Sequence, residues 1–120
     1  MGFVYYNANP RENNIGDCVA RCLSVLTNKS WRRVYDELSD LAGDVGLMFD
    51  DVSFVEDYLD NRYSRECHYS KKVGEFAKEH PYGRYAVTMN NHITAIIDGV
   101  IYDTFDPSNR IMRCAWKIGV

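Results

Sequence analysis

Residues 92–105, "HITAIIDGVIYDTF", hold two short runs of β-branched and aromatic residues that are separated by Asp98 and Gly99. An Asp-Gly pair between two such runs is the strongest short-range signal for a β-hairpin with a two-residue turn. The stretch therefore predicts two adjacent antiparallel strands in the C-terminal part of the chain.

The length of this turn decides which side chains share a face of the hairpin. A two-residue turn pairs Thr94 with Asp103, and a face repeats at every second residue along each strand. His92 and Asp103 are then diagonal neighbours on one face, where the carboxylate can accept a hydrogen bond from the imidazole. Asp106 falls on the opposite face. A bulge or a three-residue loop would reverse this assignment.

Two further segments have the character of strands. Residues 84–89 are rich in β-branched and aromatic side chains, and residues 111–118 alternate apolar and basic ones. Together with the hairpin they predict an antiparallel sheet of about four strands.

The N-terminal part of the chain instead has apolar residues at helical spacing. We expect helices over residues 17–26, 30–41, 51–63 and 71–79, after an extended lead-in over residues 1–16. N-terminal helices followed by antiparallel strands predict an α+β fold, and a length of 120 residues predicts one domain over 1–120.

Composition excludes several classes of protein. A net charge of −3 is no general signature of nucleic-acid binding, and no glycine-rich phosphate loop is present. No apolar run reaches the roughly 18 residues of a membrane span, and the start lacks a signal-peptide pattern. We therefore expect a cytoplasmic protein without nucleic-acid or membrane partners, whose four cysteines are reduced: Cys18, Cys22, Cys67 and Cys114.

Acidic residues are concentrated in residues 36–60, which contain no basic residue. The nine acids are Asp36, Glu37, Asp40, Asp44, Asp50, Asp51, Glu56, Asp57 and Asp60. This pattern predicts either a solvated helical face or a docking surface for a basic protein partner.

One cysteine has the position of a reactive thiol. Cys18 directly follows Asp17 at the predicted start of the first helix, where the positive end of the helix dipole favours the thiolate. His92 could then act as a general base, and Asp103 could fix the orientation of the imidazole. Cys22 lies one turn later on the apolar stripe, and we expect it in the core.

At these residues the sequence resembles the papain-like cysteine peptidase superfamily, and especially its small, mostly uncharacterised bacterial and phage members. The matching segments are "GDCVARCLSVLT" (16–27), "WRRVYDEL" (31–38), "HPYGRYAV" (80–87) and "NNHITAIIDGVIYDTFDP" (90–107). The resemblance implies a papain-like fold with a nucleophile on the first helix.

The resemblance also implies roles for individual residues. It makes Cys18 the nucleophile, His92 the base at the start of a strand, and Asp103 the third member of a catalytic triad on the next strand. Asp106-Pro107 is similar to the triad aspartate of bacteriocin-processing peptidases, so Asp106 is the alternative. The parity of the hairpin favours Asp103.

The oxyanion donor departs from the pattern of the superfamily. A glutamine commonly lies about six residues before the nucleophile, and Glu12 stands there in this chain. An ionised glutamate only accepts hydrogen bonds. Asn14, or Asn13, would therefore donate to the oxyanion together with the backbone N–H of Cys18.

The sequence thus favours an enzyme, a thiol protease or isopeptidase that acts on a protein or peptide and needs no cofactor. Two alternatives use the same parts: a transglutaminase-like acyl transferase, and a non-catalytic protein-binding domain or phage effector. A metal site is not expected, because Cys18 and Cys22 with Cys67-His68 lack the paired spacing of zinc sites.

Overall fold

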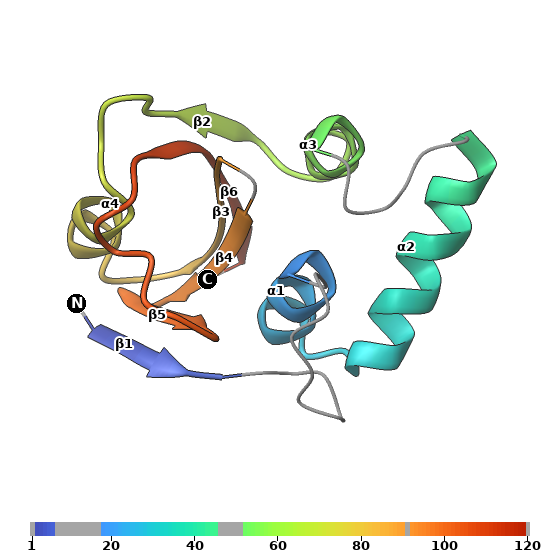
Figure 1. The fold of residues 1–120 in the computed structure, drawn as a ribbon, viewed down its shortest axis with the longest axis horizontal. Helices are drawn as coiled ribbons and strands as arrows, with labels where there is room; N and C mark the ends of the chain where they lie inside the picture. Colours follow the sequence, from blue (N-terminus) through green and yellow to red (C-terminus); the bar gives the residue numbers. More distant parts are fainter. Residues whose placement is uncertain (1, 7–17, 46–51, 91, 120) are drawn as a thin grey trace.

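The fold is described by a computed structural model that covers residues 2–6, 18–45, 52–90 and 92–119 (Figure 1). The helices are α1 (Cys18–Thr27), α2 (Trp31–Val45), α3 (Val52–Asp60) and α4 (Val73–Glu79). The strands are β1 (Gly2–Tyr5), β2 (Arg65–Cys67), β3 (Arg84–Met89), β4 (His92–Ile97), β5 (Val100–Asp103) and β6 (Met112–Gly119). The protein is therefore α+β, as its sequence predicts.

The sheet is larger than predicted and it is mixed. Its six strands follow the order β1-β5-β4-β3-β6-β2, with β1 parallel to β5 and every other neighbouring pair antiparallel. The expectation of about four antiparallel strands missed the two edge strands. β1 has four residues and β2 has three, which is too short for an alternating pattern to be recognised.

The hairpin has the predicted two-residue turn. Asp98 and Gly99 both have positive φ, 51° and 78°, which is the backbone that matches the twist of the flanking strands. The resulting register pairs Ile97 with Val100 and Ile96 with Ile101, as predicted. The inferred parity of this hairpin is therefore correct.

Helices cover both faces of the sheet (Figure 1). One group of buried side chains joins α1, α2 and α3 to Ala95 and Trp116, and a second joins α4 to Val87 and Ile96. The start of α2 is capped as its sequence predicts, because the Ser30 hydroxyl accepts a hydrogen bond from the backbone N–H of Arg33 at 3.2 Å. None of the helices in the described part of the chain has the length and apolar character to span a bilayer.

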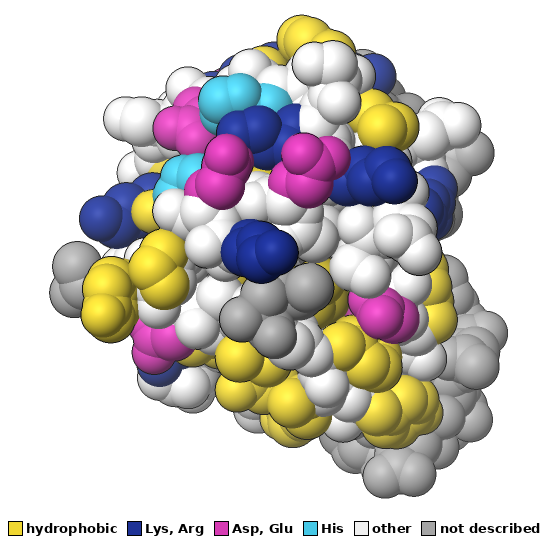
Figure 2. All heavy atoms as spheres, turned by 90° about the vertical axis from the view of Figure 1, so that its left-hand side faces the viewer, with side chains coloured by type: hydrophobic (Ala, Val, Ile, Leu, Met, Phe, Trp, Pro, Cys, Tyr) yellow, Lys and Arg dark blue, Asp and Glu magenta, His cyan; other side chains and the backbone are white. Residues whose placement is uncertain are grey.

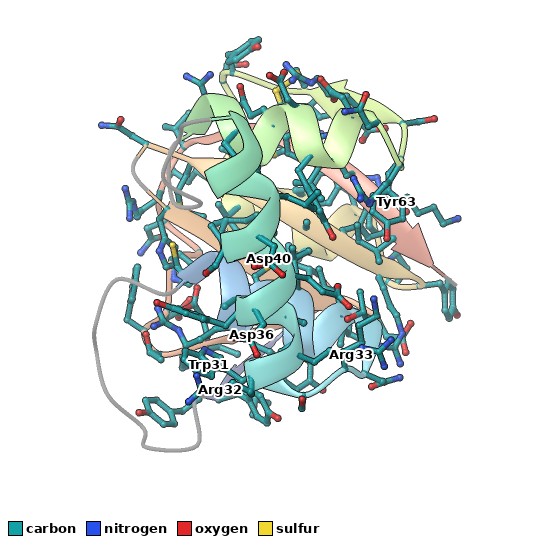
Figure 3. All side chains as sticks on the ribbon, turned by 90° about the vertical axis from the view of Figure 1, so that its right-hand side faces the viewer. Trp31, Arg32, Arg33, Asp36, Asp40 and Tyr63 are labelled. Atoms are coloured by element: carbon teal, nitrogen blue, oxygen red, sulfur yellow. A yellow bond between two sulfur atoms is a disulfide. The ribbon has the colours of Figure 1, made fainter. Side chains whose placement is uncertain are left out.

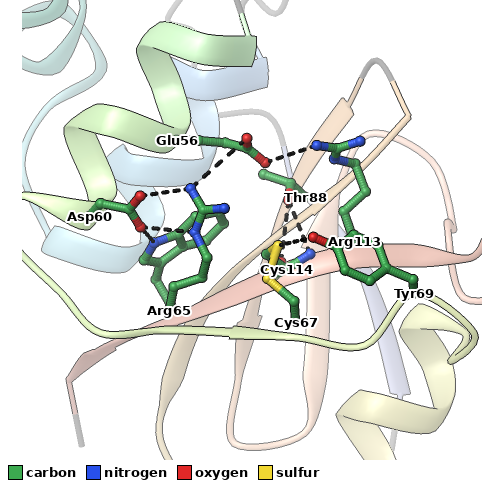
Figure 4. A network of polar contacts seen from close by, with 9 residues as sticks. Glu56, Asp60, Arg65, Cys67, Tyr69, Thr88, Arg113 and Cys114 are labelled. Carbon is green, nitrogen blue, oxygen red and sulfur yellow. Dashed lines mark hydrogen bonds and ion pairs between the residues drawn. A yellow bond between two sulfur atoms is a disulfide. The ribbon is translucent and has the colours of Figure 1, made fainter.

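A polar network ties α3 to the β2 edge (Figure 4). Asp60 accepts hydrogen bonds from the Trp116 indole at 2.9 Å and from the Arg65 guanidinium at 2.6 Å. Glu56 forms an ion pair with Arg113 at 3.5 Å. These contacts fix α3 across the edge of the sheet, although the exposure of the Arg65–Asp60 pair limits the stability that this pair adds.

The cysteines of β2 and β6 are not reduced, contrary to the sequence-based expectation. Cys67 and Cys114 are directly paired in the strand register and form a disulfide (Figure 4). The sequence could not reveal this, because the pairing depends on β2, whose existence was not predicted. Cys18 and Cys22 are the free thiols.

We predict that the denatured protein has two titratable thiols before reduction and four after it. The bridge closes a separation of 47 residues, so its loss should lower the free energy of unfolding by about 4 kcal/mol in the chain-entropy account. Thiol titration in denaturant, with peptide mass mapping of the Cys67–Cys114 pair, checks this. Four titratable thiols without reductant would contradict the disulfide.

Candidate active site

The predicted nucleophile and base lie together at the start of α1 and the start of β4. The Cys18 side chain is close enough to the His92 imidazole to raise its pKa. Cys18 is half-buried, and it is the first residue of α1. Residues more than 70 positions apart in the chain are thus brought into contact, because α1 packs along β4.

The imidazole is held from its other side by the predicted aspartate. His92 Nε2 lies 2.7 Å from Asp103 Oδ2, with both side chains largely buried. Nδ1 is therefore the ring nitrogen that remains for the thiol. Asp106 is exposed, and its Oδ1 accepts a hydrogen bond from the backbone N–H of Ser108 at 3.0 Å. The structure thus brings Asp103, rather than Asp106, to the histidine.

Thr94 also belongs to this cluster, and sequence reasoning missed its role. Its hydroxyl donates to Asp103 Oδ2 at 2.6 Å, and the backbone N–H of Thr104 donates to Oδ1 at 2.7 Å. Both carboxylate oxygens of Asp103 therefore accept hydrogen bonds. The predicted register already placed Thr94 opposite Asp103. Threonine is common in strands, however, so its presence there does not by itself indicate a functional role.

The environment of His92 favours its charged form. Burial lowers the pKa of the imidazole, but the Asp103 carboxylate, which accepts a hydrogen bond from the ring, and the neighbouring Cys18 outweigh burial and raise the pKa to about 9. The folded pKa exceeds the ordinary value of 6.5, so this contribution to stability is complete below about pH 6.5 and disappears as the pH rises through 9. Near neutral pH the ring is an imidazolium that faces the thiol.

The two free thiols differ in chemistry. Cys22 is buried, and burial together with the charge of Asp103 raises the pKa of its thiol well above the ordinary value. Cys22 therefore stays protonated near neutral pH and packs in the core, as predicted. Of the two free thiols, Cys18 alone combines partial exposure with a neighbouring imidazolium.

A small cavity lies beside the thiol. It has a volume of about 10 Å³, and its lining includes Cys18, Cys22, Arg21, Thr94 and Asp103. That volume corresponds to about one water molecule. The cavity has room for a single small polar group next to the sulfur.

The predicted oxyanion donor cannot be placed. Asn14, with Glu12 and Asn13, lies outside the described residues. The other predicted donor, the backbone N–H of Cys18, belongs to the first described residue of α1.

The other two histidines lie away from this cluster, on the α4 side (Figure 2). His68 Nε2 lies 3.0 Å from Glu66 Oε1, and the His80 ring stacks on Phe76 at a centroid distance of 3.9 Å. Among the described residues, no group of three or more histidine, cysteine, aspartate or glutamate side chains is arranged to hold a metal ion.

Comparison with known proteins does not identify a relative. No family model matches the chain, and no similar protein was found among the curated proteins or the solved structures. The interpretation of the site therefore depends on its own geometry.

We predict that iodoacetamide alkylates Cys18 faster than Cys22 in the native protein near pH 7. The imidazolium beside Cys18 favours the reactive anion, whereas burial keeps Cys22 protonated. His92→Ala should slow alkylation of Cys18 about tenfold or more, because an opposite charge at contact distance is lost. Peptide mass mapping of the alkylated sites over time measures both rates.

The matched control is His80→Ala, which removes a histidine that does not contact Cys18. It should leave the rate at Cys18 unchanged. Equal, slow alkylation of Cys18 and Cys22 in the native protein would show that Cys18 is an ordinary thiol.

Proposed function

We propose that the protein is a cysteine hydrolase, a peptidase or isopeptidase of the papain-like superfamily. The observation that carries the proposal is the series of side-chain interactions from Cys18 through His92 to Asp103, in which the His92–Asp103 hydrogen bond is 2.7 Å long. A thiol at a helix start, a histidine at a strand start and a carboxylate on the next strand also support the resemblance noted in the sequence.

The proposed reaction begins with acylation. The Cys18 thiolate attacks the carbonyl carbon of the substrate, and the oxyanion that forms is stabilised by the backbone N–H of Cys18 and, as proposed from the sequence, by Asn14. The tetrahedral intermediate then expels the amine, which takes a proton from the His92 imidazolium. The products are a thioester on Cys18, a free amine and a neutral imidazole.

Deacylation restores the starting state. Neutral His92 takes a proton from a water molecule, and the oxygen of that water attacks the thioester carbon. The Cys18 thiolate leaves, the acid product departs and His92 is again an imidazolium. Asp103 keeps the ring oriented through both steps, and Thr94 keeps Asp103 oriented through its hydroxyl.

A docking role for the acidic residues of the segment 36–60 is a separate proposal. Several of these residues form ion pairs within the protein, which the sequence did not indicate. Asp36 and Asp40 lie on the exposed side of α2 (Figure 3). Glu37, however, forms ion pairs with Lys29 and Arg33, and Glu56 and Asp60 are paired with arginines. We propose the exposed side of α2 as the contact surface for a basic protein partner.

The disulfide bears on the compartment. Disulfides persist in oxidising environments and are rare in the cytoplasm of mesophiles. The Cys67–Cys114 bridge therefore argues against the expected cytoplasmic location, from which four reduced cysteines were inferred. Cys18 and Cys22 remain thiols, so the proposed chemistry is compatible with the bridge.

We predict cleavage of fluorogenic peptides or of an isopeptide-linked lysine substrate by the full chain. Cys18→Ala should lower kcat/KM about a thousandfold or more, since the covalent step is lost, and Cys22→Ala should retain activity if the core tolerates it. Because His92 must be protonated before acylation, kcat/KM should fall as the pH rises through about 9. Steady-state kinetics from pH 6 to 10 measure this.

The products separate the alternatives. Addition of a primary amine gives an amine-bearing product if the protein is an acyl transferase, and an unchanged acid if it is a hydrolase. Cleavage that survives Cys18→Ala would overturn the proposal. No turnover on any of these substrates, with no selective alkylation of Cys18, would favour the non-catalytic binding domain.

A further inference from the structure

A larger groove lies next to the cavity beside Cys18. It has a volume of about 650 Å³ and lies over the end of α1, the start of α2 and strands β3 to β5. Tyr6, Val25 and Tyr102 line both the groove and the small cavity. The groove is therefore within reach of the residues next to a carbonyl that reaches the thiol.

The charge of the groove is positive. Lys29 and Arg84 line it, and no aspartate or glutamate does so among the described residues. The Arg84 guanidinium donates through Nη1 to the Leu26 carbonyl at 3.1 Å, at the C-terminal end of α1. That contact fixes the position of the guanidinium and uses only one of its five N–H donors fully.

The neighbouring cation is only weakly neutralised. Lys29 Nζ lies 3.4 Å from Glu37, which also pairs with Arg33, and the Lys29 side chain is 38% exposed. In the described part of the chain no carboxylate pairs with Arg84. The groove therefore offers a fixed guanidinium and a nearby ammonium to an anionic group of a ligand.

The rest of the lining is aromatic and apolar. Trp31 at the start of α2 (Figure 3), Tyr102 on β5 and Tyr6, which is 45% exposed, border the groove. Such rings bind an aliphatic or aromatic side chain and exclude water from it. Between the thiol and the cations, the groove thus suits an apolar group.

The distance between the thiol and the cations fixes a spacing in the substrate. Arg84 contacts the α1 carbonyls of Val25 and Leu26, and Val25 lies seven residues after Cys18. At about 1.5 Å per helical residue this separation is about 10 Å, which an extended peptide covers in about three residues.

We infer that the groove selects substrates with a carboxylate about three residues from the scissile bond and an apolar side chain between them. The carboxylate is either an aspartate or glutamate side chain or a free terminus. This inference rests on the proposed function, because it names the substrate class of the same site.

The test uses the full chain and fluorogenic peptides that carry Leu or Tyr next to the scissile bond. Glu, Gln or Lys is placed three residues before or three residues after that bond, with amidated ends, and one further series has Gln and a free C-terminal carboxylate. On one side of the scissile bond, the peptide with Glu should have a kcat/KM about tenfold higher than the peptide with Gln, mainly because its KM is lower. The preference should weaken at high salt. The series with the free terminus shows which source of carboxylate the groove accepts.

Charge reversal gives the decisive variants. Arg84→Glu and Lys29→Glu should each favour the Lys peptide over the Glu peptide, a reversal that a merely misfolded variant cannot produce. Lys29 is partly exposed, so its variant serves if loss of the Arg84 contact with α1 unfolds the protein. The matched control is Lys78→Glu on α4, outside the groove, which should leave the preference for Glu unchanged.

Binding to the Cys18→Ala variant separates the two proposals. Fluorescence anisotropy of labelled Glu and Gln peptides measures the groove without catalysis. Cleavage that depends on Cys18 but does not distinguish Glu from Gln would overturn the groove assignment and leave the hydrolase. Tighter binding of the Glu peptide to the variant, with no cleavage of any peptide by the wild type, would support the groove assignment and overturn the hydrolase proposal. If the wild type cleaves no peptide and the variant binds the Glu and Gln peptides equally, both proposals are overturned.

Discussion

The two-residue turn at Asp98 and Gly99 is the constraint on which the site depends. Its positive φ angles set the register of β4 and β5, and that register puts His92, Thr94 and Asp103 on one face. A slip of one residue would move Asp103 to the opposite face and leave the imidazole without its carboxylate. The chemistry that we propose therefore depends first on backbone geometry some distance from the thiol.

The buried polar cluster is stable because its members satisfy one another. An imidazolium taken out of water without partners would lose its proton, and burial does lower the pKa of His92. Asp103 and Cys18 reverse the sign of the shift, and Thr94 with the Thr104 backbone completes the hydrogen bonds of the carboxylate. Helix α1 supplies the thiol to a cluster that the hairpin has already organised.

The sequence predicted those parts of the site that follow from local rules. The Asp-Gly turn and the parity of Asp103 follow from chain patterns, and the structure agrees with both. The Cys67–Cys114 disulfide and the edge strand β2 did not follow, because they depend on long-range pairing of a three-residue strand. The positive groove also escaped prediction, since Lys29 and Arg84 meet only after α1 packs against the sheet.

The most direct measurement of the central claim is an NMR titration of the His92 ring in the wild type and in Asp103→Asn. If the imidazole lies between a carboxylate and a thiolate, its pKa is about 9 in the wild type and falls toward the ordinary value of 6.5 in the variant. The His68 and His80 signals provide internal references in the same spectra. A wild-type His92 that titrates near 6.5 and is unaffected by Asp103→Asn would contradict the account.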